Sequence, residues 1–200
     1  MHKFNLQDKI INFYHDNKFG IKTSGVVEVQ NQDSVHYATF SYHTIFQILN
    51  HLKCNKSDIF IDLGCGKGRV LCCAAQFKLG KVIGVELDKK IFEAGEKNIL
   101  KLKTRITDVE IKNIPAEIFN YQNVNKIFLF NPFGMATLKK VLEKIEISLK
   151  ESPHKFQIIY VNPIHENLFK SIGWLSQVEK WEKNKHSHLE HDVSFWGTNY

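Results

Sequence analysis

A carboxylate and three glycines stand together in residues 59–70, which read IFIDLGCGKGRV. A run of strand-forming residues leads to Asp62, and Gly64, Gly66 and Gly68 follow in the order G-x-G-x-G. Such a turn brings a ligand against bare backbone. A dinucleotide turn has the spacing G-x-G-x-x-G, and a triphosphate loop has a lysine followed by serine or threonine. The turn fits neither phosphate-binding pattern.

Asp62 favours a ligand that carries positive charge. A carboxylate at the end of this strand faces the ligand cleft, where it would repel a pyrophosphate and attract a sulfonium or an ammonium group. Two unit charges about 5 Å apart interact by roughly 3 kcal/mol at an effective dielectric constant near 20. That energy changes an affinity about a hundredfold.

A second acid follows the next strand, in the segment GVELD. Glu86 lies about 20 residues after Gly66, at the position where an acid accepts hydrogen bonds from the ribose hydroxyls of a nucleotide cofactor. S-adenosylmethionine (SAM) carries both a ribose and a sulfonium. We therefore expect SAM as the cofactor and S-adenosylhomocysteine as the product.

Strand-like and helix-like segments alternate along the chain. The apolar spacing predicts an N-terminal helix that buries Leu6, Ile10, Phe13 and Tyr14, and further helices over residues 42–52, 67–78, 89–102, 135–150 and 165–173. Strands are expected within residues 58–64, 81–88, 108–114, 125–133, 155–163, 175–181 and 191–197. This order predicts an α/β three-layer sandwich, with a mostly parallel seven-stranded sheet and an antiparallel C-terminal edge.

The chain resembles the class I SAM-dependent methyltransferases, which have a seven-strand Rossmann-like fold. The matching motifs are IDLGCGKG, GVEL, the IPAE turn at residues 114–117 and LFNPF at residues 129–133, and the resemblance covers roughly residues 36–165. It implies the strand order 3-2-1-4-5-7-6. It also implies a single domain over residues 1–200, with an N-terminal cap helix and lid segment in residues 1–40 and a Rossmann-like core in residues 41–200.

The resemblance also implies which residues bind the cofactor. They are Asp62, Gly64, Cys65, Gly66, Glu86, Leu87, Ala116, Glu117 and Asn131, joined by Tyr37 and Thr39 from the N-terminal segment that closes over the methionine end. Many members carry an aspartate after strand three that binds adenine, whereas this chain has the IPAE turn. Adenine recognition is therefore expected from the Ala116 backbone and the Glu117 side chain.

The expected catalytic corner is Asn131, Pro132 and Phe133. It resembles the Asn-Pro-Pro-Tyr/Phe corner of N-methyltransferases, although the second proline is absent. In that corner the amide oxygen and the proline carbonyl accept the N–H hydrogens of the acceptor, and the aromatic ring covers it. Nitrogen is therefore favoured over oxygen as the acceptor atom. A second corner, residues 160–163, contains Asn-Pro and is interpreted mainly as a turn.

The composition leaves the acceptor open. The net charge is +6, but only Arg69 and Arg105 among the 27 basic residues are arginines, which favours a lysine-rich surface over a nucleic-acid site. A protein or a small molecule is therefore the favoured acceptor, and RNA or DNA is the alternative. A SAM-binding module without catalysis and an NAD-dependent oxidoreductase are the candidates from other classes.

The remaining expectations concern the environment of the protein. The four cysteines form no CxxC pair, and the histidines of the tail are too loosely spaced to predict a metal site. No leader peptide and no apolar run of membrane-spanning length is evident, so we expect a cytoplasmic monomer or homodimer without a membrane partner.

Overall fold

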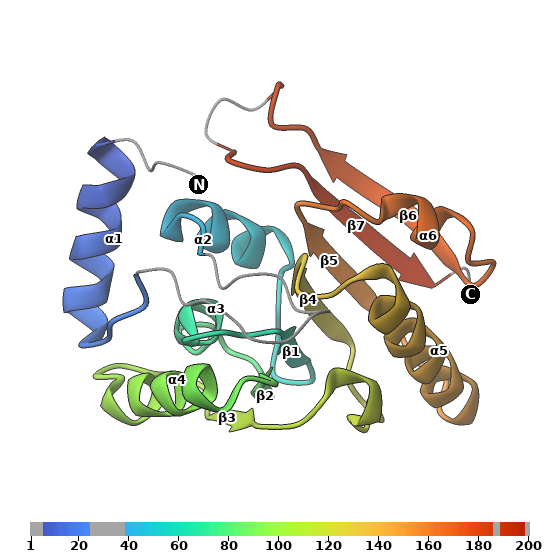
Figure 1. Cartoon of the computed structure of the whole chain (residues 1–200), viewed down its shortest axis with the longest axis horizontal. Coiled ribbons are helices and arrows are strands. Elements are labelled where there is room, and N and C mark those ends of the chain that lie inside the picture. The colour runs from blue at the N-terminus through green and yellow to red at the C-terminus, as the bar shows by residue number, and fades with distance from the viewer. Residues whose placement is uncertain (1–5, 25–38, 186–188, 199–200) are drawn as a thin grey trace.

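The computed structural model describes residues 6–24, 39–185 and 189–198, which include one seven-stranded sheet with the order β3-β2-β1-β4-β5-β7-β6. Neighbouring strands among the first five are parallel, and β7 runs antiparallel to both β5 and β6 (Figure 1). The predicted strand order and antiparallel edge are confirmed. The strands are β1 (Ile59–Leu63), β2 (Lys81–Val85), β3 (Val109–Lys112), β4 (Lys126–Phe130), β5 (Gln157–Val161), β6 (Leu175–Trp181) and β7 (Val193–Thr198).

Helices cover both faces of the sheet, because successive strand residues point to opposite sides. Phe60 of β1 packs in a core with residues of α2 and α3, whereas its neighbour Ile61 packs in a second core with residues of α5. The helices are α1 (Leu6–Phe19), α2 (Tyr42–His51), α3 (Arg69–Ala74), α4 (Lys89–Lys101), α5 (Met135–Glu151) and α6 (Glu166–Lys170), with a short 3-10 turn η1 (Ala116–Ile118).

Helix α1 forms as predicted, but the prediction of its buried face is wrong. Ile10, Phe13 and Tyr14 are 61%, 73% and 58% exposed. Asn12 and Phe19 are buried instead, and Asn12 accepts a hydrogen bond from a buried arginine of α3. The side of α1 that meets the core therefore carries both apolar and polar contacts, and Ile10, Phe13 and Tyr14 are not part of it.

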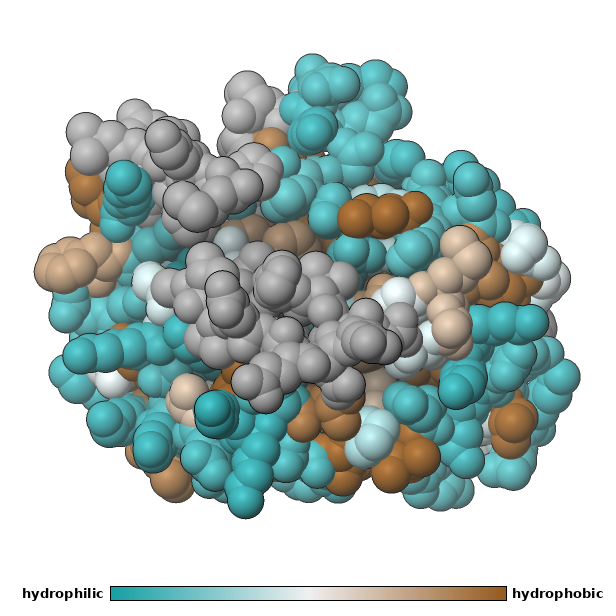
Figure 2. Space-filling view, viewed as in Figure 1, coloured by the Kyte–Doolittle hydropathy of each residue, from teal (hydrophilic) through white to brown (hydrophobic). Residues whose placement is uncertain are grey.

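The surface agrees with the lysine-rich composition. The face shown in Figure 2 is mostly hydrophilic, and its hydrophobic side chains lie in separate small groups. No helix in the described ranges is both long enough and apolar enough to cross a membrane.

Candidate functional site

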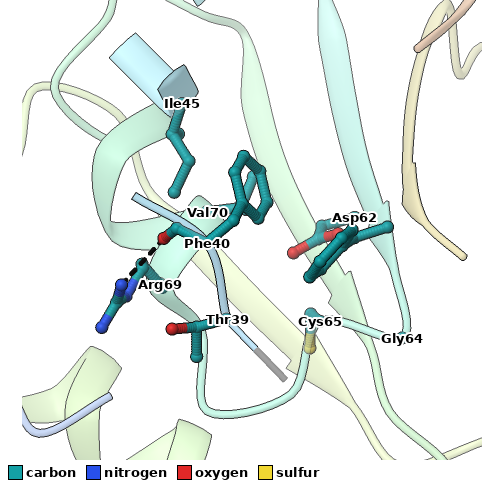
Figure 3. Close-up of a pocket in the computed structure, with 9 residues that line it drawn as sticks. Thr39, Phe40, Ile45, Asp62, Gly64, Cys65, Arg69 and Val70 are labelled. Carbon is teal, nitrogen blue, oxygen red and sulfur yellow. Dashed lines mark hydrogen bonds between the residues drawn. The ribbon is translucent and has the colours of Figure 1, made fainter. Parts of the chain in front are cut away.

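The glycine-rich turn lies at the carboxyl end of β1, in the centre of the sheet. Asp62 is next to the last residue of β1, between Gly84 of β2 and Phe128 of β4 in the strand register. The turn borders a cavity (Figure 3). The residues that line this cavity are Thr39, Phe40, Ile45, Asp62, Gly64, Cys65, Arg69, Val70 and Phe130. Parallel α/β sheets bind ligands at this edge.

Asp62 is a buried acid at the wall of the cavity, and it is only 3% exposed. Burial raises the pKa of Asp62 well above its usual range, and the nearby Glu86 carboxylate raises it further. In the described part of the chain, no lysine or arginine forms a salt bridge with Asp62. A cation entering the cavity would therefore meet a carboxyl group that no described lysine or arginine pairs with.

Backbone geometry explains the glycines of the turn. Gly64, Gly66 and Gly68 have φ angles of 71°, 57° and 82°, which L side chains rarely adopt. The backbone N–H groups of Gly64 and Cys65 both donate to the carbonyl oxygen of Val85, at 2.8 and 3.0 Å. A Cβ atom on Gly64 would overlap the ring of Pro132. The turn after β1 thus lies directly against the corner after β4.

Glu86 lies directly after β2 and reaches back to the turn. Its Oε2 accepts a hydrogen bond from the Gly66 N–H at 2.9 Å, and its Oε1 accepts one from the Asp88 N–H at 2.9 Å. Burial raises the pKa of Glu86, although these backbone hydrogen bonds oppose the shift. The Asn113 amide donates to the carbonyl oxygens of Glu86 and Leu87, at 2.9 Å each. These contacts hold the acid beside the turn.

The turn after β3 is η1. Ala116 is buried, and its carbonyl oxygen accepts a hydrogen bond of 2.8 Å from the hydroxyl of Tyr121. The Glu117 side chain is half-buried. The Ala116 carbonyl is therefore already engaged within the protein.

The expected catalytic corner follows β4. Asn131 is 5% exposed and has a φ of 41°, a left-handed conformation that asparagine tolerates better than most residues. Its Oδ1 accepts a hydrogen bond of 2.8 Å from the Tyr160 hydroxyl. Phe133 is half-buried and packs against the core on the α5 side. Tyr160, the fourth residue of β5, thus contributes a direct contact to the corner after β4.

The end of the N-terminal segment borders the cavity. Thr39 is half-buried and lines the cavity, whereas Tyr37 lies outside the described residues. The sequence did not single out Phe40, although it also lines the cavity, with its ring centroid 4.7 Å from that of Phe130. The sequence feature that could have identified Phe40 is its position directly after Thr39, one of the predicted lid residues.

Arg69 is a second cavity residue that the sequence prediction missed. It is 3% exposed, and its guanidinium donates to Thr23 Oγ1 at 2.8 Å, Asn12 Oδ1 at 3.0 Å and the Phe40 carbonyl at 2.8 Å (Figure 3 draws the last). Its position directly after the third glycine, where a basic side chain enters the start of a helix, was the signal in the sequence. Arg69 joins the turn to the N-terminal segment.

Comparisons with known proteins identify the family of the chain. The model of the family described as "Histone methylation protein DOT1" matches residues 25–197. A protein-lysine N-methyltransferase of Saccharolobus islandicus is 30% identical over 133 residues, which are 64% of this chain and 81% of the relative.

Solved structures show the same fold. An RNA methyltransferase from Salinibacter ruber, in complex with S-adenosyl-L-homocysteine, has a TM-score of 0.59 and 17% identity over 80% of this chain and 94% of its own. A SAM-dependent O-methyltransferase from Thermotoga maritima has a TM-score of 0.60 and 19% identity over 81% of this chain and 67% of its own. With the family match, these likenesses confirm the predicted enzyme class and cofactor: the chain belongs to the family of the histone methylation protein DOT1 and is a SAM-dependent methyltransferase.

Proposed function

We propose that this enzyme transfers the methyl group of SAM to the side-chain nitrogen of a lysine in a protein acceptor. The observation that carries the proposal is the 30% identity with a protein-lysine N-methyltransferase over 133 residues. The description of the matching family, a histone methylation protein, also supports a protein acceptor. The amide-bearing corner after β4 supports nitrogen as the acceptor atom.

The residues around the cavity fit the donor. The buried Asp62 carboxyl, which pairs with no described lysine or arginine, is suited to the positive sulfonium, and Glu86 is suited to the ribose hydroxyls. Gly64 and Gly66 offer bare backbone beside the methionine moiety. We assign the adenine side to Leu87, Ala116 and Glu117, and the remaining cofactor contacts to Cys65, Thr39 and Tyr37. Asn131, which the resemblance also places beside the cofactor, is assigned to the acceptor. When bound, SAM supplies a methyl group that is activated by its positive sulfur.

The corner after β4 is suited to an amine. Asn131 Oδ1 and the Pro132 carbonyl can accept the N–H hydrogens of a neutral lysine amine, which directs its lone pair toward the methyl group. Phe133 and Phe130 provide apolar surface for the methylene stem of the lysine. A lysine in water is protonated, so its proton must leave to solvent before the attack. The protein's contribution is therefore alignment and exclusion of water, which an in-line displacement requires.

The direct test of this site is Asn131→Ala. We expect SAM affinity within about twofold of wild type by calorimetry, because Asn131 acts on the acceptor, and a turnover lower by roughly 10²-fold, the usual effect of removing one preorganised polar group. Asn167→Ala is the matched control, because Asn167 is exposed on α6. Equal turnover in Asn131→Ala and wild type would remove Asn131 from the mechanism.

A further inference from the structure

Tyr160 connects the ends of two neighbouring strands. It is the fourth residue of β5, is 1% exposed, and donates a hydrogen bond of 2.8 Å to Asn131 Oδ1. The backbone N–H of His165 donates to the same hydroxyl oxygen at 3.3 Å. One hydroxyl group thus touches the corner after β4 and the start of α6.

The hydrogen-bond pattern around this hydroxyl fixes the orientation of the Asn131 amide. A tyrosine hydroxyl has one hydrogen to donate, and the His165 N–H is itself a donor and cannot accept it. The hydrogen must therefore go to Asn131, which must present its oxygen. If the amide were rotated to present its NH2 group, the hydroxyl hydrogen would be buried without an acceptor among the described residues, which costs about 1–3 kcal/mol.

The hydroxyl keeps its hydrogen throughout the range in which an enzyme works. Burial raises the pKa of Tyr160 to about 12, with a further increase from Glu166 and an opposing contribution from the His165 hydrogen bond. The donor to Asn131 is consequently present at every ordinary pH. The amide oxygen has two lone pairs, so one remains for an N–H of the acceptor.

We propose that Tyr160 is a positioning residue for methyl transfer, whose hydroxyl holds the Asn131 amide with its free oxygen lone pair available to the acceptor nitrogen. The inference rests on the role of Asn131 in the proposed function and adds to it a residue from the next strand. Without the hydroxyl, the amide can rotate to present NH2, a donor that cannot accept an N–H. Only the fraction of enzyme molecules that present the Asn131 oxygen could then transfer the methyl group.

The test is Tyr160→Phe, assayed with saturating SAM on an acceptor that the wild type methylates. We expect kcat to fall by roughly 10–100-fold while SAM affinity stays within about twofold. The matched control is Thr107→Val, which also removes a buried hydroxyl. Thr107 lies just before β3, far from the carboxyl ends of the strands, and its hydroxyl is within hydrogen-bond distance of the Phe77 and Leu79 carbonyl oxygens, at 2.7 and 3.1 Å. It should lower stability and leave kcat unchanged.

The double variant separates positioning from a general loss of structure. If Tyr160 acts through Asn131, Tyr160→Phe should cause no further loss of kcat in the Asn131→Ala background. The proposal is overturned if the full loss persists in that background, or if kcat of the single variant stays within about twofold of wild type.

A measurement by nuclear magnetic resonance (NMR) that needs no methyl acceptor keeps this test independent of the proposed function. The side-chain NH2 signal of Asn131 is assigned in the SAM-bound protein by its disappearance in Asn131→Ala. In Tyr160→Phe it should shift or broaden, and in Thr107→Val it should stay in place. An unchanged signal in Tyr160→Phe overturns the inference. A wild type that methylates no lysine but shows the expected signal change contradicts the proposed function alone.

Discussion

The guanidinium of Arg69 donates a hydrogen bond of 2.8 Å to the carbonyl oxygen of Phe40, across 29 residues of the chain. Arg69 directly follows the glycine turn, whereas Phe40 precedes α2 and lines the cavity. The same guanidinium lies over the Tyr42 ring, 4.5 Å from its centroid. The glycine-rich turn and the segment that contains Phe40 are therefore fastened to each other by one buried side chain.

Arg69→Ala should destabilise the protein strongly. The change leaves buried oxygen atoms of Asn12, Thr23 and Phe40 without their donor, and we expect the free energy of unfolding to fall by about 3 kcal/mol or more. The other arginine provides the control, because Arg105 forms an exposed 3.9 Å ion pair with Asp108. Arg105→Ala should change stability by at most about 0.5 kcal/mol. Urea denaturation compares the two, and equal losses would refute the fastening role.

Asp62→Asn tests the charge at the cofactor site. The substitution keeps the shape and removes the carboxylate, so SAM affinity should fall by up to about a hundredfold. S-adenosylhomocysteine has a neutral sulfur, and its affinity should fall much less. Calorimetric titration of wild type and variant with both compounds measures the loss of affinity for each. A similar loss for the two compounds would mean that Asp62 does not recognise the sulfonium.

SAM binding should strengthen as the pH rises. In the ligand-free protein the pKa values of Asp62 and Glu86 are both raised, so these groups hold protons above the ordinary carboxyl range. The sulfonium favours the ionised carboxylates, and SAM binding must therefore release protons. The affinity should rise from the ordinary carboxyl range up to the raised pKa values and then level off.

Calorimetry in buffers of different ionisation enthalpy measures the number of protons released on SAM binding, and Asp62→Asn should reduce this number.

The stability of the ligand-free protein should show the opposite dependence on pH to the SAM affinity. Raised pKa values mean that the folded state binds more protons, so these two acids lower stability as the pH rises through the same window. A SAM affinity that does not change with pH across this window would contradict the linkage.

Gly64→Ala should impair both binding and turnover. Gly64 has a φ of 71°, which costs an alanine roughly 1–2 kcal/mol, and its new methyl group would overlap Pro132. The turn and the catalytic corner would have to move apart. Gly173→Ala is the control, because a Cβ there meets nothing within 4 Å. Thermal unfolding and SAM titration of both variants compare them, and a Gly64→Ala protein that matches wild type would show that the turn tolerates a side chain.

The sequence predicted the parts of the site that depend on local pattern. Asp62 and Glu86 lie at the carboxyl ends of two neighbouring strands, β1 and β2, so their place at one edge of the sheet followed from the parallel arrangement. The resemblance supplied the strand order.

Contacts between distant segments were not predictable in this way. Arg69 meets Asn12 across 57 residues, and Tyr160 meets Asn131 across 29. The error on α1 has the same cause, because apolar spacing favoured Ile10 and Phe13 for burial, whereas Asn12 and Phe19 meet partners from distant segments.

The central claim is that SAM and lysine are the two substrates. The most direct measurement incubates the enzyme with SAM carrying an isotope-labelled methyl group and with separate protein, RNA and small-molecule fractions of a cell lysate. Mass spectrometry after complete hydrolysis then identifies the labelled residue. The account predicts labelled N-methyllysine in the protein fraction and its loss with Asn131→Ala. Label that enters only RNA or only small molecules, or SAM binding without any transfer, would contradict it.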